Sequence, residues 1–136
     1  MADLPAYVLD SFAFLAYLTD EPSAARVEML IEDASKEKCR LLLPLINLGE
    51  ILYITERRGG INKAQDTLAL LRQLPIEILP ADEQSVLAAA HIKANHALSY
   101  ADAFIVAASE QEDAIILTSG REFQTVEELV TIEWLE

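Results

Sequence analysis

The feature that most constrains this chain is the alternation of short, continuously apolar runs with longer segments of helical periodicity. The apolar runs are residues 7–9, 40–43, 76–79, 114–117 and 130–132. Runs this short and this apolar are typical of parallel strands buried on both faces. The pattern predicts a three-layer α/β/α fold around a central, mainly parallel sheet of four to five strands.

The segments between the apolar runs predict the helices. They cover residues 12–18, 24–36, 45–58, 62–74, 82–93 and 99–110. Asn62, Asp82 and Ser99 are expected to cap the helices that they precede, because their side chains can accept hydrogen bonds from free backbone amides. Gly60 and Pro75 are expected to end helices.

Length and composition indicate the class of protein. The chain has 136 residues, 52% of them hydrophobic, which predicts a single domain over residues 1–136 with a substantial core. The longest apolar run, around residues 41–48, is far shorter than the roughly 20 residues that cross a bilayer, and no secretion signal is recognisable. Cys39 is the only cysteine, so we expect a cytoplasmic protein without a membrane partner.

The charge balance restricts the partners. The net charge is −13, from 23 acidic and 10 basic residues. A surface this acidic argues against broad electrostatic binding to nucleic acid, which requires basic patches. It favours a basic partner, a bound cation or simply a well-solvated surface.

Three carboxylates stand out because their neighbours in the sequence are apolar. Asp10 directly follows the first apolar run, Glu50 lies within residues 45–53, and Asp102 lies within residues 98–106. Buried carboxylates are normally paired or bound to metal, and Mg²⁺ prefers oxygen ligands. Ligands of open parallel sheets collect beyond the carboxyl ends of the strands, where Asp10 is expected to lie. The three residues therefore predict a cation site.

Each carboxylate also has a purely structural interpretation. Asp10 is well placed to cap the first helix. Ser99 and Asp102 have the spacing of a capping box, although Glu or Gln is the usual second partner. Glu50 fits an exposed helix face less well, because Ile46 and Ile54, one turn away on either side, are apolar. The sequence leaves both interpretations open.

Taken together, three segments resemble the PIN domain. They are Tyr-Val-Leu-Asp-Ser at 7–11, Asn-Leu-Gly-Glu-Ile-Leu-Tyr at 47–53 and Leu-Ser-Tyr-Ala-Asp-Ala-Phe-Ile-Val-Ala at 98–107. The second and third are especially similar to VapC-type toxins of VapBC toxin–antitoxin pairs. The resemblance covers almost the whole chain, in order and with suitable spacing.

The resemblance implies a metal-dependent endoribonuclease that acts as a toxin and hydrolyses RNA phosphodiesters. Carried over by position, Asp10, Glu50 and Asp102 are the expected catalytic residues and the ligands of Mg²⁺ or Mn²⁺. Ser11 is expected to help orient the site through its hydroxyl group.

The resemblance also implies partners. These are an RNA substrate, a second copy of the chain in a homodimer, and an antitoxin whose basic segment would suit the acidic surface. Arg57 and Arg58, with Lys63 nearby, form a local basic cluster that is a candidate RNA-backbone contact. A solvated basic face explains the same residues equally well.

One position departs from the family pattern. Such proteins usually carry an Asp in a Thr-Gly-Asp-like turn after the fourth strand, where this chain has Gly120, or Ser119 if the turn is shifted. Glu122, in an expected helical turn, either reaches into the site or is an exposed acid. The alternative function is therefore a weakened or inactive PIN-like protein that binds a protein or RNA without cleavage.

A phosphoacceptor domain of the response-regulator type fits less well. It would need paired acids after the first strand, an Asp after a middle strand and a Lys after a late strand. Here Asp10 is single, the third strand ends at Leu79-Pro80, and no Lys follows the fourth strand.

Overall fold

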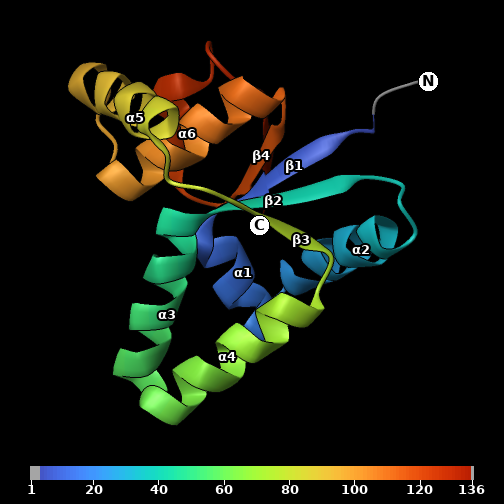
Figure 1. Cartoon of the computed structure of the whole chain (residues 1–136). Coiled ribbons are helices and arrows are strands. Elements are labelled where there is room, and N and C mark those ends of the chain that lie inside the picture. Colours follow the sequence, from blue (N-terminus) through green and yellow to red (C-terminus); the bar gives the residue numbers. More distant parts are fainter. Residues whose placement is uncertain (1–3, 136) are drawn as a thin grey trace.

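The centre of the molecule is a parallel five-stranded sheet with the strand order β3-β2-β1-β4-β5 (Figure 1). The computed structural model describes residues 4–135. The strands are β1 (Ala6–Leu9), β2 (Arg40–Pro44), β3 (Ile76–Leu79), β4 (Ile115–Thr118) and β5 (Ile132–Trp134). The predicted three-layer α/β/α class is therefore confirmed.

The last strand lies two residues later than predicted. The sequence pattern places it at residues 130–132, whereas β5 runs from Ile132 to Trp134. The amides of Leu129 and Val130 both donate to the carbonyl of Val126, at 2.9 and 3.2 Å. These turn hydrogen bonds hold Val130 outside the sheet although it is β-branched.

The helices follow the predicted periodicity. They are α1 (Ser11–Leu18), α2 (Ala24–Ser35), α3 (Leu45–Gly59), α4 (Ile61–Gln73), α5 (Glu83–Asn95), α6 (Tyr100–Glu112) and the short 3₁₀ helix η1 (Arg121–Val126). Asp82 caps α5 as predicted, because its side chain accepts a hydrogen bond from the Ser85 amide at 2.9 Å. Asn62 does not cap α4. That helix begins at Ile61 after Gly60, whose φ of 88° allows the sharp turn from α3.

Alternate strand residues enter two separate cores. Val8, Leu42 and Ile116 pack with α5 and α6 on one face of the sheet. Leu9, Leu43 and Leu117 pack with α1, α2, α3 and α4 on the other face. Figure 1 shows these two helical layers on opposite sides of the strands. Within the described residues no helix has the length and apolarity needed to cross a membrane.

The parallel arrangement brings all the carboxyl ends of the strands to one edge of the sheet. Helices α1 and α3 begin directly at that edge, because Ser11 follows β1 after one residue and Leu45 follows β2 without a loop. The opposite edge carries an open cavity of about 1080 Å³, lined by the starts of β1, β2 and β3. Functional residues at the ends of the strands are therefore separated from this cavity by the length of the sheet.

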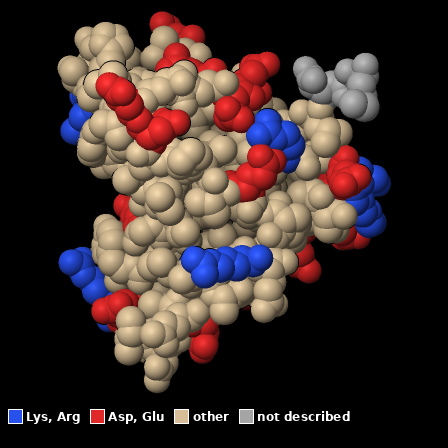
Figure 2. Space-filling model, viewed as in Figure 1, with Lys and Arg blue, Asp and Glu red and all other residues tan. Residues whose placement is uncertain are grey.

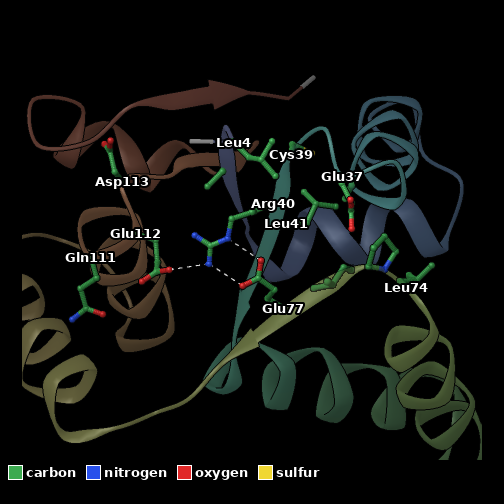
Figure 3. A pocket seen from close by; sticks show the side chains of 14 residues that line it. Leu4, Glu37, Cys39, Arg40, Leu41, Leu74, Glu77, Gln111, Glu112 and Asp113 are labelled. Atoms are coloured by element: carbon green, nitrogen blue, oxygen red, sulfur yellow. Dashed lines mark hydrogen bonds and ion pairs between the residues drawn. The ribbon is translucent and has the colours of Figure 1, made fainter. Parts of the chain in front are cut away.

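Arg40 organises the cavity at the amino-terminal edge. Figure 3 shows its guanidinium group between two carboxylates, with hydrogen bonds of 2.8 and 2.9 Å to Glu77 and 3.1 Å to Glu112. The ion pairs connect β2 to β3 and to α6. Such partly exposed pairs contribute up to about 1 kcal/mol each. Arg40 is thus occupied by acids of its own chain, and its role there is structural.

Candidate active site

Asp10 lies at the end of β1, and its side chain is held by the neighbouring strand. Its carboxylate oxygen Oδ2 accepts a hydrogen bond from the Thr118 hydroxyl at 2.8 Å, and that hydroxyl accepts one from the Gly120 amide at 2.9 Å. Asp10 occupies the N-cap position of α1, but its side chain makes no hydrogen bond of capping geometry within the described residues. Its orientation is therefore fixed by β4 rather than by capping.

The environment of Asp10 disfavours a negative charge. The residue is only 2% exposed, and its second oxygen, Oδ1, has no hydrogen-bond partner among residues 4–135. Its pKa is raised to about 7, mainly by burial and also by the charges of Asp102 and Glu50, while the hydrogen bond from Thr118 lowers it. A bound cation would relieve both the burial cost and the repulsion.

Glu50 and Asp102 contribute to the same negative region. Glu50 is half-buried in the second turn of α3, and its charge raises the pKa of both aspartates. Asp102 is half-buried in the first turn of α6. Its pKa is raised to about 6, first by burial and then by the charges of Glu122 and Glu50, while hydrogen bonds with Ser99 lower it. The charges of the three predicted residues therefore influence one another.

Both interpretations of Ser99 and Asp102 hold at once. The Ser99 hydroxyl caps α6 by accepting a hydrogen bond from the Asp102 amide at 3.1 Å, as predicted. The carboxylate of Asp102 still feels the charge of the other acids. Capping thus positions the first turn of α6 without removing Asp102 from the candidate site.

Asn47 joins the three elements that carry these acids. It is fully buried, and its side-chain amide donates to the backbone carbonyl of Ala101 at 3.2 Å. The backbone carbonyl of Asn47 accepts a hydrogen bond from the Ser11 hydroxyl at 3.4 Å. Ser11 follows Asp10, Ala101 precedes Asp102, and Asn47 lies one turn before Glu50. Asn47 is not among the predicted site residues, although a polar residue between Ile46 and Leu48 was a usable signal.

We expect Asn47→Ala to weaken the site as well as the fold. The substitution leaves the Ala101 carbonyl without its partner and loosens α6 against α3, at a cost of about 1–3 kcal/mol of stability. By analogy with residues that orient metal ligands, Mn²⁺ affinity should fall about tenfold or more. Denaturant unfolding and calorimetric titration of the same samples measure the two effects. An unchanged Mn²⁺ affinity would show that the bridge serves the fold alone.

The donor set suits a hard divalent cation. The candidate ligands supply only carboxylate oxygens, as Mg²⁺ and Mn²⁺ prefer, and Asp10 Oδ1 is a buried acceptor without a partner among the described residues. Within residues 4–135 no three His, Cys, Asp or Glu side chains lie close enough to share one ion. Ion binding to all three acids therefore requires side-chain adjustment, which half-buried Glu50 and Asp102 permit.

The predicted basic cluster lies away from these acids. Arg57, Arg58 and Lys63 are exposed around the turn between α3 and α4, and the Arg57 guanidinium lies 5.0 Å from the centre of the Tyr53 ring. Seven residues of helix separate Glu50 from Arg57, which corresponds to about 10 Å along α3. Figure 2 shows basic side chains only as isolated spots on a face where acidic ones are more numerous.

The raised pKa values predict an unusual pH dependence of stability in the metal-free protein. Asp10 and Asp102 hold protons up to about pH 7 and 6 when folded, against an ordinary pKa of 3.8. The folded state therefore binds more protons than the unfolded state above pH 4, and stability should fall as the pH rises toward 8. Denaturant unfolding in EDTA at pH 5 and 8 tests this. The double variant Asp10→Asn/Asp102→Asn should show a flatter dependence of stability on pH. An equally steep dependence in this variant would show that the other surface charges cause it.

Comparison with known proteins gives a family match and a set of similar folds. The model of the PIN domain family matches residues 7–129. A chain of the VapBC2 complex from Rickettsia felis, bound to a promoter DNA fragment, superposes with a TM-score of 0.75 at 14% identity, covering 96% of this chain and 99% of that one. A chain of DNA-bound VapBC from Salmonella typhimurium superposes with a TM-score of 0.74 at 18% identity, covering 96% of this chain and 98% of that one.

A third similar structure is that of a toxin from another organism. Mycobacterium tuberculosis VapC20, described as a toxin that cleaves the sarcin–ricin loop, superposes with a TM-score of 0.67 at 13% identity, covering 93% of this chain and 96% of that one. A sequence search of curated proteins finds no match. At these identities the structural similarities establish a shared fold.

Proposed function

The chain belongs to the PIN domain family, and on this basis we propose that it is a Mg²⁺- or Mn²⁺-dependent endoribonuclease, acting as the toxin of a toxin–antitoxin pair. The observation that carries the proposal is the buried carboxylate of Asp10, which has one oxygen unpaired among the described residues and whose pKa is raised by the charges of two further acids. A buried carboxylate that also feels the charges of two half-buried acids is best explained by a cation that the three would share.

Each acid has a separate task in the proposed reaction. Asp10 would be the rigid ligand, because Thr118 fixes Oδ2 and leaves Oδ1 without a hydrogen-bond partner among the described residues. Glu50 and Asp102 are the adjustable ligands on α3 and α6. When bound, the ion supplies two kinds of chemistry: it lowers the pKa of an attacking water and offsets the charge that develops on the phosphate. Ser11 holds the start of α1 against Asn47 and so supports the position of Asp10.

RNA binding by so acidic a protein requires local compensation. Without a cation the acids would repel a phosphate group, so a cation held by them would also favour substrate binding. The exposed guanidinium groups of Arg57 and Arg58 are candidates for contacts with the RNA backbone farther along α3. VapC20, with its similar fold, is a toxin that cleaves the sarcin–ricin loop of an RNA, which supports RNA as the substrate class.

The proposed regulator is an antitoxin with a basic segment. Several similar structures are toxin–antitoxin complexes, and a net charge of −13 favours a basic partner. Such a segment could place a Lys or Arg near the acids and compete with the cation. The lone, buried Cys39 is consistent with a reducing cytoplasmic setting.

We also propose that the protein is a homodimer in which each subunit is a single domain. Large apolar side chains are exposed at the starts of α1, α3 and α6, all near the carboxyl edge of the sheet; they are Phe12, Leu45, Ile46 and Tyr100. Exposed apolar surface of this kind is typical of protein contacts. Light scattering coupled to size-exclusion chromatography measures the mass, and a monomer at micromolar concentration would contradict the dimer.

The function is tested with a labelled RNA library and the purified protein. We expect cleavage in Mg²⁺ or Mn²⁺, loss of cleavage in EDTA and recovery when the ion is restored. A single-stranded DNA library of the same sequences serves as the substrate control. Cleavage that persists in EDTA would contradict a metal-dependent mechanism.

A protein that binds without cleaving is the second candidate. It is favoured by Gly120, which stands where the family pattern places a fourth acid. Retention of RNA without cleavage, in saturating Mn²⁺, would support it. Gain of cleavage in Gly120→Asp would then identify the missing acid as the cause.

A further inference from the structure

Trp134 is the only tryptophan of the chain, and it lies exposed in the last position of β5. Its side chain is 41% exposed, although tryptophan is highly buried on average in folded proteins. Among residues 4–135 it belongs to neither of the two cores. A large aromatic surface left exposed on a strand is typical of a contact with another molecule.

The strand register places Trp134 beside the candidate site. Trp134 is paired with Thr118 of β4, and the Leu135 amide donates to the Thr118 carbonyl at 2.8 Å. On its other side, the Thr118 hydroxyl donates to Asp10 at 2.8 Å. Asp10, Thr118 and Trp134 therefore form a row across the carboxyl ends of three neighbouring strands. Because neighbouring strands lie about 5 Å apart, the Cα atoms of Asp10 and Trp134 are roughly 10 Å apart.

The three side chains of this row project from the same face of the sheet, because side chains alternate between the two faces along a strand. The residues two positions before the row all pack against the core under α5 and α6; they are Val8, Ile116 and Ile132. Glu133, directly before Trp134, faces the opposite side, where it pairs with Arg26 of α2 at 2.6 Å. Trp134 is therefore on the face covered by α6, whose first turn carries Asp102.

Arg121 brings a positive charge to the same edge. It is the first residue of η1 and follows Gly120, whose amide donates to the Thr118 hydroxyl at 2.9 Å. The Arg121 side chain is exposed and forms no ion pair with any other residue in the range 4–135. A guanidinium group without an acidic partner is well suited to bind a phosphate.

An aromatic ring, a cation and a phosphate site in one row match the chemistry of a single nucleic-acid strand. Unpaired bases stack on aromatic side chains, and the phosphates between them contact cations. A phosphate bound near Asp10 would leave the base of a nearby nucleotide within reach of the indole. Stacking of an uncharged base is also compatible with a net charge of −13. A contact with another protein would cover the indole too, but it would not explain why Trp134 is aligned with Asp10.

We propose that Trp134 is a stacking platform for an unpaired base of the RNA substrate, and that Arg121 contacts a phosphate of the same strand. The inference rests on the proposed function, because it concerns the substrate of the same site. Trp134 is then a specificity-determining residue that favours single-stranded over base-paired RNA. It takes no part in the chemistry, and it tolerates different bases because each of them has a π face.

The single tryptophan allows a direct test in the unmodified chain, because all indole fluorescence comes from Trp134. We expect a single-stranded RNA oligonucleotide in Mn²⁺, measured immediately after mixing, to quench this fluorescence until it saturates. A duplex of the same sequence, and an abasic strand of the same length, should leave it unchanged. Quenching by the abasic strand would assign the change to charge and overturn stacking. A blue shift that grows with protein concentration in the absence of RNA would place the indole in a protein contact and overturn the proposal.

Substitutions at Trp134 give a second test, with binding measured by the anisotropy of a labelled oligonucleotide. Trp134→Ala should weaken binding about tenfold and raise KM with little change in kcat. Trp134→Phe keeps an aromatic ring and should retain most of the affinity. Leu129→Ala is the matched control, because Leu129 is similarly exposed but lies near the start of β4 at the opposite edge. An equal loss of affinity in Trp134→Ala and Leu129→Ala would overturn the role of Trp134.

The contribution of Arg121 is measured by the salt dependence of binding. Arg121→Gln should reduce the slope of log affinity against log salt concentration by about one. Arg72→Gln, which alters an exposed residue in the last turn of α4, should leave the slope unchanged. An unchanged slope in Arg121→Gln would overturn the phosphate contact. Thermal unfolding of each variant checks that the fold is intact.

The outcomes separate this inference from the proposed function. RNA cleavage with unchanged Trp134 fluorescence, and with an unchanged KM in Trp134→Ala, overturns the stacking platform and leaves the nuclease standing. Saturable quenching by an RNA that is never cut supports Trp134 and contradicts the nuclease. The absence of both quenching and cleavage overturns both proposals.

Discussion

Asp10→Asn is expected to abolish Mn²⁺ binding and metal-dependent RNA cleavage while raising the Tm of the metal-free protein. The asparagine keeps an acceptor for the Thr118 hydroxyl but removes a buried charge beside Asp102 and Glu50. At pH 8 we expect the free energy of unfolding of the metal-free protein to rise by about 1 kcal/mol or more, which corresponds to roughly 3–6 °C in Tm. Cleavage should fall at least about 100-fold. Calorimetry, thermal unfolding in EDTA and the RNA assay measure the three effects.

The opposite signs of these effects are the diagnostic feature. Altering a residue that only supports the fold should lower the stability of the protein. Altering a metal ligand that is held at an energetic cost should raise the stability of the metal-free protein. Glu110→Gln, an exposed acid near the other end of α6, is the matched control and should change neither quantity. If Asp10→Asn lowers the Tm in EDTA, Asp10 is a structural residue and the cation site is wrong.

Phe123→Ala is expected to cause the largest loss of stability. Phe123 is completely buried against the α6 side of the sheet, and no cavity there can collapse without moving η1. Truncation of a buried phenylalanine costs about 3–5 kcal/mol, which here corresponds to roughly 10–20 °C in Tm. Denaturant unfolding measures the loss.

A conservative control separates packing from other effects of this substitution. Phe123→Leu keeps an apolar side chain and should cost only about 1 kcal/mol. A small stability loss in Phe123→Ala would mean that η1 is not tightly packed on the core.

The arrangement of strands and helices could be predicted because each run of residues carries a local signal. The runs 40–43 and 76–79 are short and mostly apolar, and the side chains of Asp82 and Ser99 cap helices by accepting hydrogen bonds from amides three residues later. The order of the strands carries no local signal, since it depends on which helices cross which face. The capping residue of α4 was predicted wrongly, because Gly60 rather than Asn62 occupies the N-cap position of that helix.

The acids were predictable for a related reason, whereas their support was not. Asp10, Glu50 and Asp102 are anomalies within apolar segments, and a sequence shows such anomalies directly. Contacts between distant segments leave no such trace: Thr118 bonds to Asp10 across 108 residues, and Asn47 to Ala101 across 54. The position of the Glu122 side chain depends on the missing Cβ of Gly120, which only the three-dimensional arrangement reveals.

The sheet order also determines when the site can form as the chain is made. Strand β1 lies between β2 and β4, so Asp10 is synthesised early but acquires its Thr118 contact only after β4 has emerged and paired. A ribosome-bound chain that stops before residue 115 has no β4 and cannot orient the carboxylate. The nascent protein therefore cannot assemble its candidate site before nearly all of the described sequence has been translated, which separates synthesis from any activity that the site confers.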